Sequence, residues 1–217
     1  MAGATEPISA AALATGWTFD PVAALGTALA AGAYVAGVRR LAARGRRWPR
    51  GCSASFAAGI LALVLATQSG LARYDTVLFS AHVGQHVLIG IVAPLLLALG
   101  APVTLFLQAA SRPTQVNLLR LLRTPYARFL GHPLTAWLVF GATLFVLYFS
   151  PLYELSLRND VVHGWVHIHF LVAGCLFAWA TIGLDPVPHR LGYDGRLLLV
   201  VLTVPFHAFL GLALMAG

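Results

Sequence analysis

The chain is dominated by apolar stretches long enough to cross a membrane, and this limits it to a membrane fold. A spanning helix needs roughly 20 consecutive, mostly apolar residues. About six such stretches occur, near residues 21–38, 53–69, 76–100, 133–150, 161–183 and 196–216. With 59% hydrophobic and 10% charged residues, the sequence is too apolar for a soluble protein of 217 residues. We therefore predict an all-α polytopic bundle of about six transmembrane helices.

The positive charge of the chain is confined to arginines in the loops, and this predicts the orientation. All 14 basic residues are Arg. The loop after the first span carries six of them, so the positive-inside rule makes that loop cytoplasmic and the N-terminus extracytoplasmic. Twelve of the arginines fall in the predicted inner segments, and two, Arg73 and Arg158, in the outer loops. For a chain with this pattern we expect contact with membrane lipid rather than with nucleic acid.

The predicted organisation has two parts and one long inner connection. Residues 1–20 form a short extracytoplasmic segment, and residues 21–217 form a single transmembrane bundle. The first 20 residues contain no basic residue and so lack the charged start of a secretory signal, which predicts that the first span is retained. Residues 103–128 carry four arginines and are predicted to lie as a cytoplasmic connection with an apolar side on the membrane surface.

Two of the predicted spans carry paired histidines. His82 and His86 are four residues apart in the third span, and His163 and His167 repeat this spacing in the fifth. Residues four apart on a helix face the same way, so each pair presents two imidazoles on one side. Ionisable side chains inside a membrane are costly and commonly mark functional sites.

The predicted topology places these pairs at overlapping depth. At about 1.5 Å per residue, His82 and His86 lie about 8 to 14 Å below the outer surface, and His163 and His167 lie between the surface and about 9 Å. His207 in the last span lies about 12 Å deep on the same arithmetic. Neutral imidazole suits copper, zinc, iron or nickel. We predict a metal site on the two pairs, with His207 as a candidate fifth ligand.

Several further polar residues are candidates for the surroundings of this site. His169 lies about 200° around the helix from His167, so it is expected to orient a ligand or to hydrogen-bond another helix. Carboxylates that hydrogen-bond to ligand histidines commonly orient them. The outer-side acids are Glu154, Asp160 and Asp75, and each of them can equally be a solvated loop residue. His132 and His189, at the cytoplasmic ends, are predicted to be structural or solvated.

The sequence offers little support for hydrolytic chemistry. Val, Gly and Gln separate His82 from His86, so the acid of an H-E-x-x-H metalloprotease motif is missing. There is also no Gly-rich phosphate-binding loop and no G-x-S-x-G nucleophile motif. Hydrolysis is therefore a weak hypothesis, and our first hypothesis is a protein that is not an enzyme.

With these motifs placed, the chain resembles the multi-spanning CtaG-type family of cytochrome c oxidase assembly factors. The matching stretches are residues 79–86 (FSAHVGQH), 93–103 (APLLLALGAPV), 132–133 (HP), 150–154 (SPLYE), 163–170 (HGWVHIHF), 185–193 (DPVPHRLGY) and 205–211 (PFHAFLG). The resemblance implies a bacterial plasma-membrane protein that helps to deliver copper to a haem-copper oxidase. The implied partners are the catalytic subunit of the oxidase and an extracytoplasmic copper donor.

The chain departs from the family pattern in one respect that bears on copper. Val83 and Val87 stand beside the first histidine pair where the family usually has Met, so copper binding falls to imidazole, with Cys175 as a candidate further ligand. Two other interpretations stay open. The histidines can ligate a haem, or they can bridge helices in a structural or accessory subunit of a respiratory complex.

Overall fold

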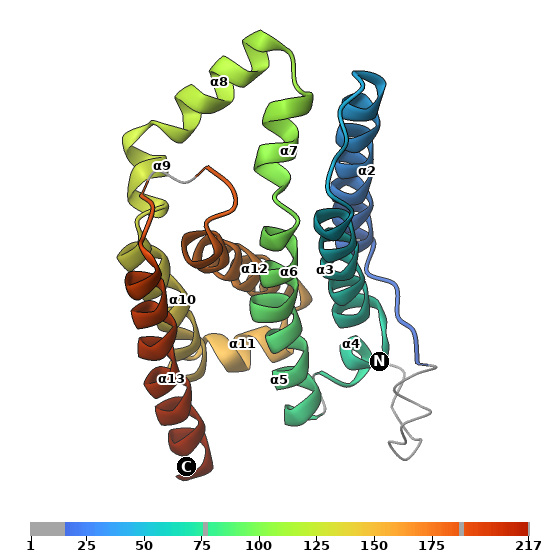
Figure 1. The fold of residues 1–217 in the computed structure, drawn as a ribbon. Helices are drawn as coiled ribbons and strands as arrows, with labels where there is room; N and C mark the ends of the chain where they lie inside the picture. The colour runs from blue at the N-terminus through green and yellow to red at the C-terminus, as the bar shows by residue number, and fades with distance from the viewer. Residues whose placement is uncertain (1–15, 76–77, 187–188, 217) are drawn as a thin grey trace.

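The computed structural model describes residues 16–75, 78–186 and 189–216, and this part of the chain contains helices and no strands (Figure 1). The all-α prediction is therefore confirmed. The helices are α2 (Pro21–Ala43), α3 (Arg50–Gln68), α4 (Gly70–Tyr74), α5 (Phe79–Val87), the π-helical turn η1 (Leu88–Val92), α6 (Ala93–Leu99), α7 (Pro102–Ala109), α8 (Arg112–Leu122), α9 (Pro125–Leu130), α10 (Pro133–Tyr148), α11 (Leu152–Arg158), α12 (Asp160–Ile182) and α13 (Tyr193–Ala216).

Four helical stretches of the described chain are long and apolar enough to cross a membrane. They are Pro21–Ala43, Arg50–Tyr74, Phe79–Ala109 and Asp160–Ile182. A fifth arises if α10 and α11, which are bent by 71° relative to each other, count as one span. The predicted number of six is not confirmed, although α13 covers the predicted sixth span. The N-terminal orientation stays a prediction, and most of the segment 1–20 lies outside the described residues.

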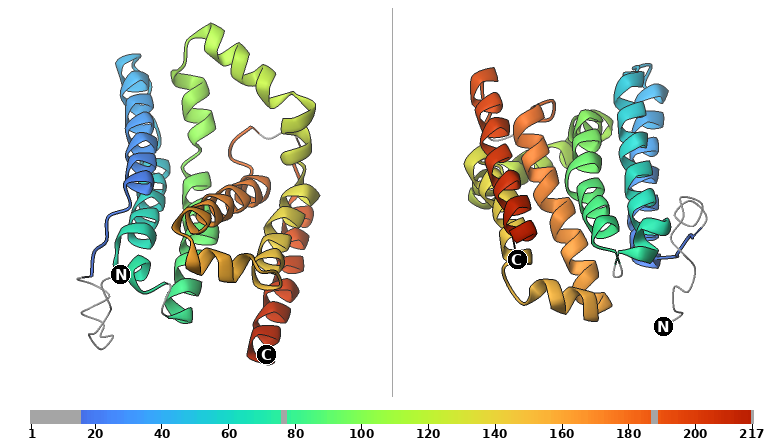
Figure 2. Two further views of the ribbon diagram at one scale, coloured as in Figure 1. Left: turned by 180° about the vertical axis from the view of Figure 1, so that it is seen from behind. Right: turned by 90° about the horizontal axis from the view of Figure 1, so that it is seen from below.

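Helix α12 occupies the middle of the bundle. It contacts η1 and α6 on one side and α10, α11 and α13 on the other. Figure 2 shows α12 between these two groups, with α3 and α2 beyond α6. A helix with neighbours on both sides can present histidines to the interior, and this is the position from which α12 contributes to the site.

A π-helical turn and a close helix crossing lie just past the first histidine pair. Pro94 has no N–H to donate to the preceding turn, and η1 is the adjacent segment in which the helix widens. At the same level α12 carries Gly174, where an added Cβ would collide with the carbonyl oxygen of Gly90. The crossing therefore depends on a glycine, and it brings η1 directly against α12.

The connection predicted for residues 103–128 is only partly correct. Residues 102–109 form α7, which extends the apolar stretch begun at α5 and packs along α2 rather than lying on the membrane surface. The chain does turn at the predicted break, where Ala101 has a φ of 47°. Buried Asp185 caps α7 from a distant segment, accepting hydrogen bonds from the backbone N–H of Val103 (3.2 Å) and Thr104 (2.7 Å). The arginines of this region lie on or beside α8 and α9.

Candidate metal centre

The two histidine pairs meet where α5 faces α12. Within each helix the ring centroids are 4.1 Å apart for His82 and His86 and 4.3 Å apart for His163 and His167. Between the helices, His82 lies 6.0 Å from His163 and His86 lies 5.5 Å from His167. The i,i+4 spacing on both helices thus produces a compact cluster of four imidazoles, which we call the histidine cluster.

The polar atoms of α5 in this cluster are buried without partners. His82 and His86 are 1% and 4% exposed. Both ring nitrogens of each residue are buried and have no hydrogen-bond partner within the described part of the chain. A buried polar group without a hydrogen bond costs on the order of 1 to 3 kcal/mol. A metal ion bound to the imidazole lone pairs would remove part of this cost.

Asp75 supplies a carboxylate at the α12 side of the histidine cluster. This residue ends α4 and is buried, and its Oδ2 lies 3.1 Å from Nε2 of His163. Asp75, His163 and His167 each offer a ligand atom, and these three atoms lie within 4.8 Å of one another. A carboxylate and two imidazoles in this arrangement can hold a transition-metal ion. Asp75 can act either as a ligand or as the group that orients His163.

Gln85 fixes the orientation of His167, a role that was not predicted from the sequence. The Nε2 of Gln85 donates to the backbone carbonyl of Ala66 at 3.0 Å, so its Oε1 is the atom that faces His167 Nε2 at 3.2 Å. An amide oxygen only accepts, and the ring proton of His167 therefore lies on Nε2. This leaves the lone pair on Nδ1 for a metal. The signal was available, because Gln85 lies one turn from His82 inside the same motif.

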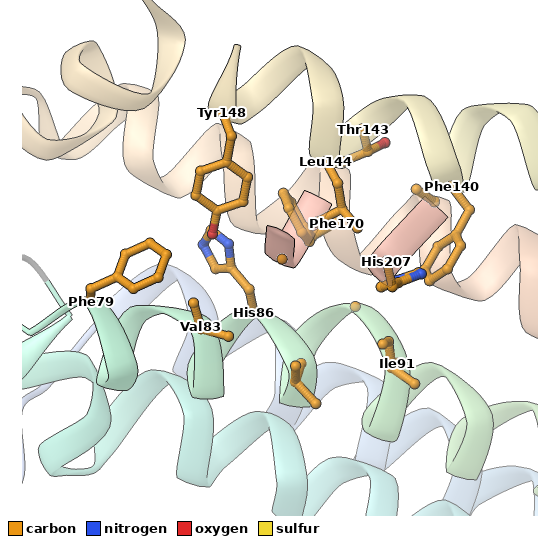
Figure 3. A pocket seen from close by; sticks show the side chains of 14 residues that line it. Phe79, Val83, His86, Ile91, Phe140, Thr143, Leu144, Tyr148, Phe170 and His207 are labelled. Atoms are coloured by element: carbon orange, nitrogen blue, oxygen red, sulfur yellow. The ribbon is translucent and has the colours of Figure 1, made fainter. Parts of the chain in front are cut away.

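The structure does not bring His207 into the histidine cluster. Its Nδ1 lies 3.0 Å from the carbonyl of Thr203 on its own helix, to which it donates, and its ring packs beside Phe140. His207 and His86 do line the same apolar cavity of about 280 Å³. In the view of Figure 3, Phe170 and Leu144 lie between the two histidines.

The other predicted surroundings lie elsewhere. His169 Nε2 is 2.9 Å from the hydroxyl of Thr143 on α10, which is the helix-bridging alternative of the two predicted for it. Glu154 is exposed and forms an ion pair of 3.9 Å with Arg158, and Asp160 is exposed in the first turn of α12. Of the three acids named from the sequence, Asp75 is the one that contacts an imidazole, whereas Glu154 pairs with Arg158.

The two histidines at the opposite end of the bundle also approach each other. The rings of His132 and His189 have centroids 5.1 Å apart, and both residues are half-buried. They come from the start of α10 and from the segment before α13. This contact joins two distant segments, which agrees with the structural alternative of the two predicted for these histidines, structural or solvated.

These features define the class of protein as a helical, multi-pass membrane protein with a buried histidine cluster between two of its helices. The family model for the cytochrome c oxidase caa3 assembly factor (CtaG) matches residues 32–217. The chain belongs to this family of assembly factors, and the resemblance found in the sequence is confirmed. The matched region includes the whole histidine cluster.

The chain is also similar to mycobacterial proteins that are described as uncharacterized. An uncharacterized protein of Mycobacterium bovis is 41% identical over 218 aligned positions, and one of Mycobacterium leprae is 38% identical over 209. The alignments cover 97% and 93% of this chain. The chain spans about a third of the length of these relatives, 33% and 32% respectively. No solved structure matches the chain.

Proposed function

We propose that the chain holds a copper ion on His82, His86, His163 and His167 and serves the assembly of a haem-copper oxidase in the bacterial plasma membrane. The observation that carries the proposal is the burial of four unpartnered ring nitrogens on α5 directly opposite the second pair on α12. Imidazole is a good ligand for copper, and the family provides the reason to favour copper over zinc, iron or nickel.

The copper ion is the cargo of this site, and the role is not catalytic. His163 and His167 are positioned by Asp75 and Gln85, so the α12 side of the site is oriented before a metal arrives. The ring nitrogens of His82 and His86 have no hydrogen-bond partner within the described residues, and their rings pack beside Tyr153 and Phe170.

Two cavities reach the histidine cluster from the sides of the bundle. His86 lines the cavity of about 280 Å³ among α5, α10, α12 and α13, and His167 lines a larger groove beside α2. We propose that an extracytoplasmic donor supplies copper and that the catalytic subunit of the oxidase receives it at this depth. The apolar walls would keep water from competing for the metal during transfer.

A structural role is the second candidate, because one histidine already serves it. His169 bridges α12 to α10 through Thr143. If the histidine cluster acted in the same way, its nitrogens would be paired with other helices. His163 and His167 do contact other segments, through Asp75 and Gln85. The ring nitrogens of His82 and His86 have no partner within the described residues, and this favours the metal site.

The test is the metal content of the detergent-purified protein after exposure to Cu(I) and removal of excess metal. We compare the wild type with a His86→Ala, His167→Ala double variant and with His169→Ala as the matched control, since His169 lies on the same helix outside the cluster. We expect about one copper per chain in the wild type and the control and almost none in the double variant. Equal copper in all three proteins, or a haem absorption band, would overturn the proposal.

A further inference from the structure

A long groove opens on the side of the bundle between α2 and α12. It encloses about 1440 Å³ and is lined by residues of α2, α3, α7 and α12. Small and apolar side chains form most of its wall, among them Ala30, Ala33, Ile60, Leu105 and Ile168. An apolar groove of this size within the membrane-spanning part of the chain has to be filled by hydrocarbon or by another protein segment.

The two ends of this groove carry opposite charges. Arg40 and Arg44 line it near the end of α2, whereas the lining acids Asp20 and Asp160 lie at the starts of α2 and α12. Because α2 has 23 residues, it is about 35 Å long, so the basic and acidic ends are separated by a distance comparable to the thickness of a membrane. No acidic residue of the lining accompanies the two arginines.

The basic end has further groups that suit an anionic oxygen. Arg44 is held against the wall by a hydrogen bond of 3.1 Å from its Nη1 to the carbonyl of Gln108. Ser111 and Thr114 also line the groove here, with their hydroxyl oxygens 2.9 Å apart. They stand at the start of α8, an 11-residue helix whose N-terminus carries a partial positive charge.

We propose that this groove is a binding site for an anionic phospholipid of the leaflet at the arginine-rich side. The phosphate contacts Arg40 and Arg44, and the acyl chains lie along the apolar wall between α2 and α12. Basic pockets between transmembrane helices recognise anionic lipid head groups in this way. A helix of a partner protein fits less well, because it would have to bring an acidic residue to the paired arginines.

The first test is lipid retention. The protein is loaded with an equimolar mixture of phosphatidylglycerol and phosphatidylcholine, washed in detergent and examined by native mass spectrometry. Arg40→Gln, Arg44→Gln is compared with Arg120→Gln, Arg123→Gln, which removes the same charge from exposed positions outside the groove lining. We expect the wild type and the control to retain phosphatidylglycerol. The groove variant should retain at least tenfold less phosphatidylglycerol than the wild type. Equal retention by the two variants would overturn the proposal.

A second pair of variants tests the apolar part of the groove. Ala33 lines it, whereas Gly32 does not and has open space around an added Cβ. We expect Ala33→Phe to reduce retention of phosphatidylglycerol severalfold and Gly32→Phe to leave it unchanged. If Ala33→Phe instead turns a dimer into a monomer without changing the bound lipid, a second copy of the chain occupies the groove and the proposal is wrong.

Discussion

Replacing Gln85 by Leu should weaken copper binding without displacing a ligand. The side chain makes two hydrogen bonds, 3.0 Å to the carbonyl of Ala66 and 3.2 Å to Nε2 of His167. Leucine has a similar volume and makes neither, so the ring of His167 loses the bond that fixes its proton on Nε2. Loss of such an outer partner costs about 10- to 100-fold in metal affinity. This is about 1.4 to 2.8 kcal/mol.

The assay is a Cu(I) competition titration against a chromogenic chelator. Gln68→Leu is the matched control, because Gln68 is also buried and also makes two hydrogen bonds, both to the backbone of Asp20. We expect the two variants to lose similar thermal stability, since each gives up two hydrogen bonds. Only Gln85→Leu should lose affinity for copper. Wild-type affinity in Gln85→Leu, or an equal loss in both variants, would refute the role assigned to Gln85.

Two further substitutions separate the function of the site from its packing. Asp75→Asn should lower copper affinity about tenfold, because it removes the charge facing His163, whereas Glu154→Gln should leave the same chelator titration unchanged. Gly174→Ala should destabilise the bundle by about 1 to 3 kcal/mol through the collision with Gly90, measured by thermal unfolding in detergent. Gly164→Ala on the same helix has open space and should not destabilise; equal losses at both glycines would contradict the close crossing.

The local part of the site could be predicted from the sequence. An i,i+4 spacing is a property of one helix, so His82 with His86 and His163 with His167 were each expected to share a face. The contact between the two pairs, across α5 and α12, could not be deduced from the spacing within either helix. It depends on the crossing at Gly90 and Gly174, and a single glycine in an apolar stretch does not indicate which helix it faces.

The surroundings of the site were harder to predict for the same reason. Asp75 follows the short helix α4 and Glu154 lies in the first turn of the short helix α11, both on the predicted outer side. Only the path of the chain decides that Asp75 is buried beside His163 while Glu154 pairs with Arg158. The extension of α7 along α2 was missed because its cap, Asp185, comes from a segment about 80 residues away.

The central claim is that imidazoles of α5 and α12 bind one copper ion together. X-ray absorption at the copper edge, recorded on the copper-loaded wild type and on His82→Ala, His163→Ala, tests it most directly. We predict a first shell of nitrogen and oxygen ligands with the multiple-scattering pattern of at least three imidazoles in the wild type, and loss of this pattern or of the copper itself in the variant. A sulfur-dominated shell, or an identical imidazole pattern in both proteins, would contradict the account.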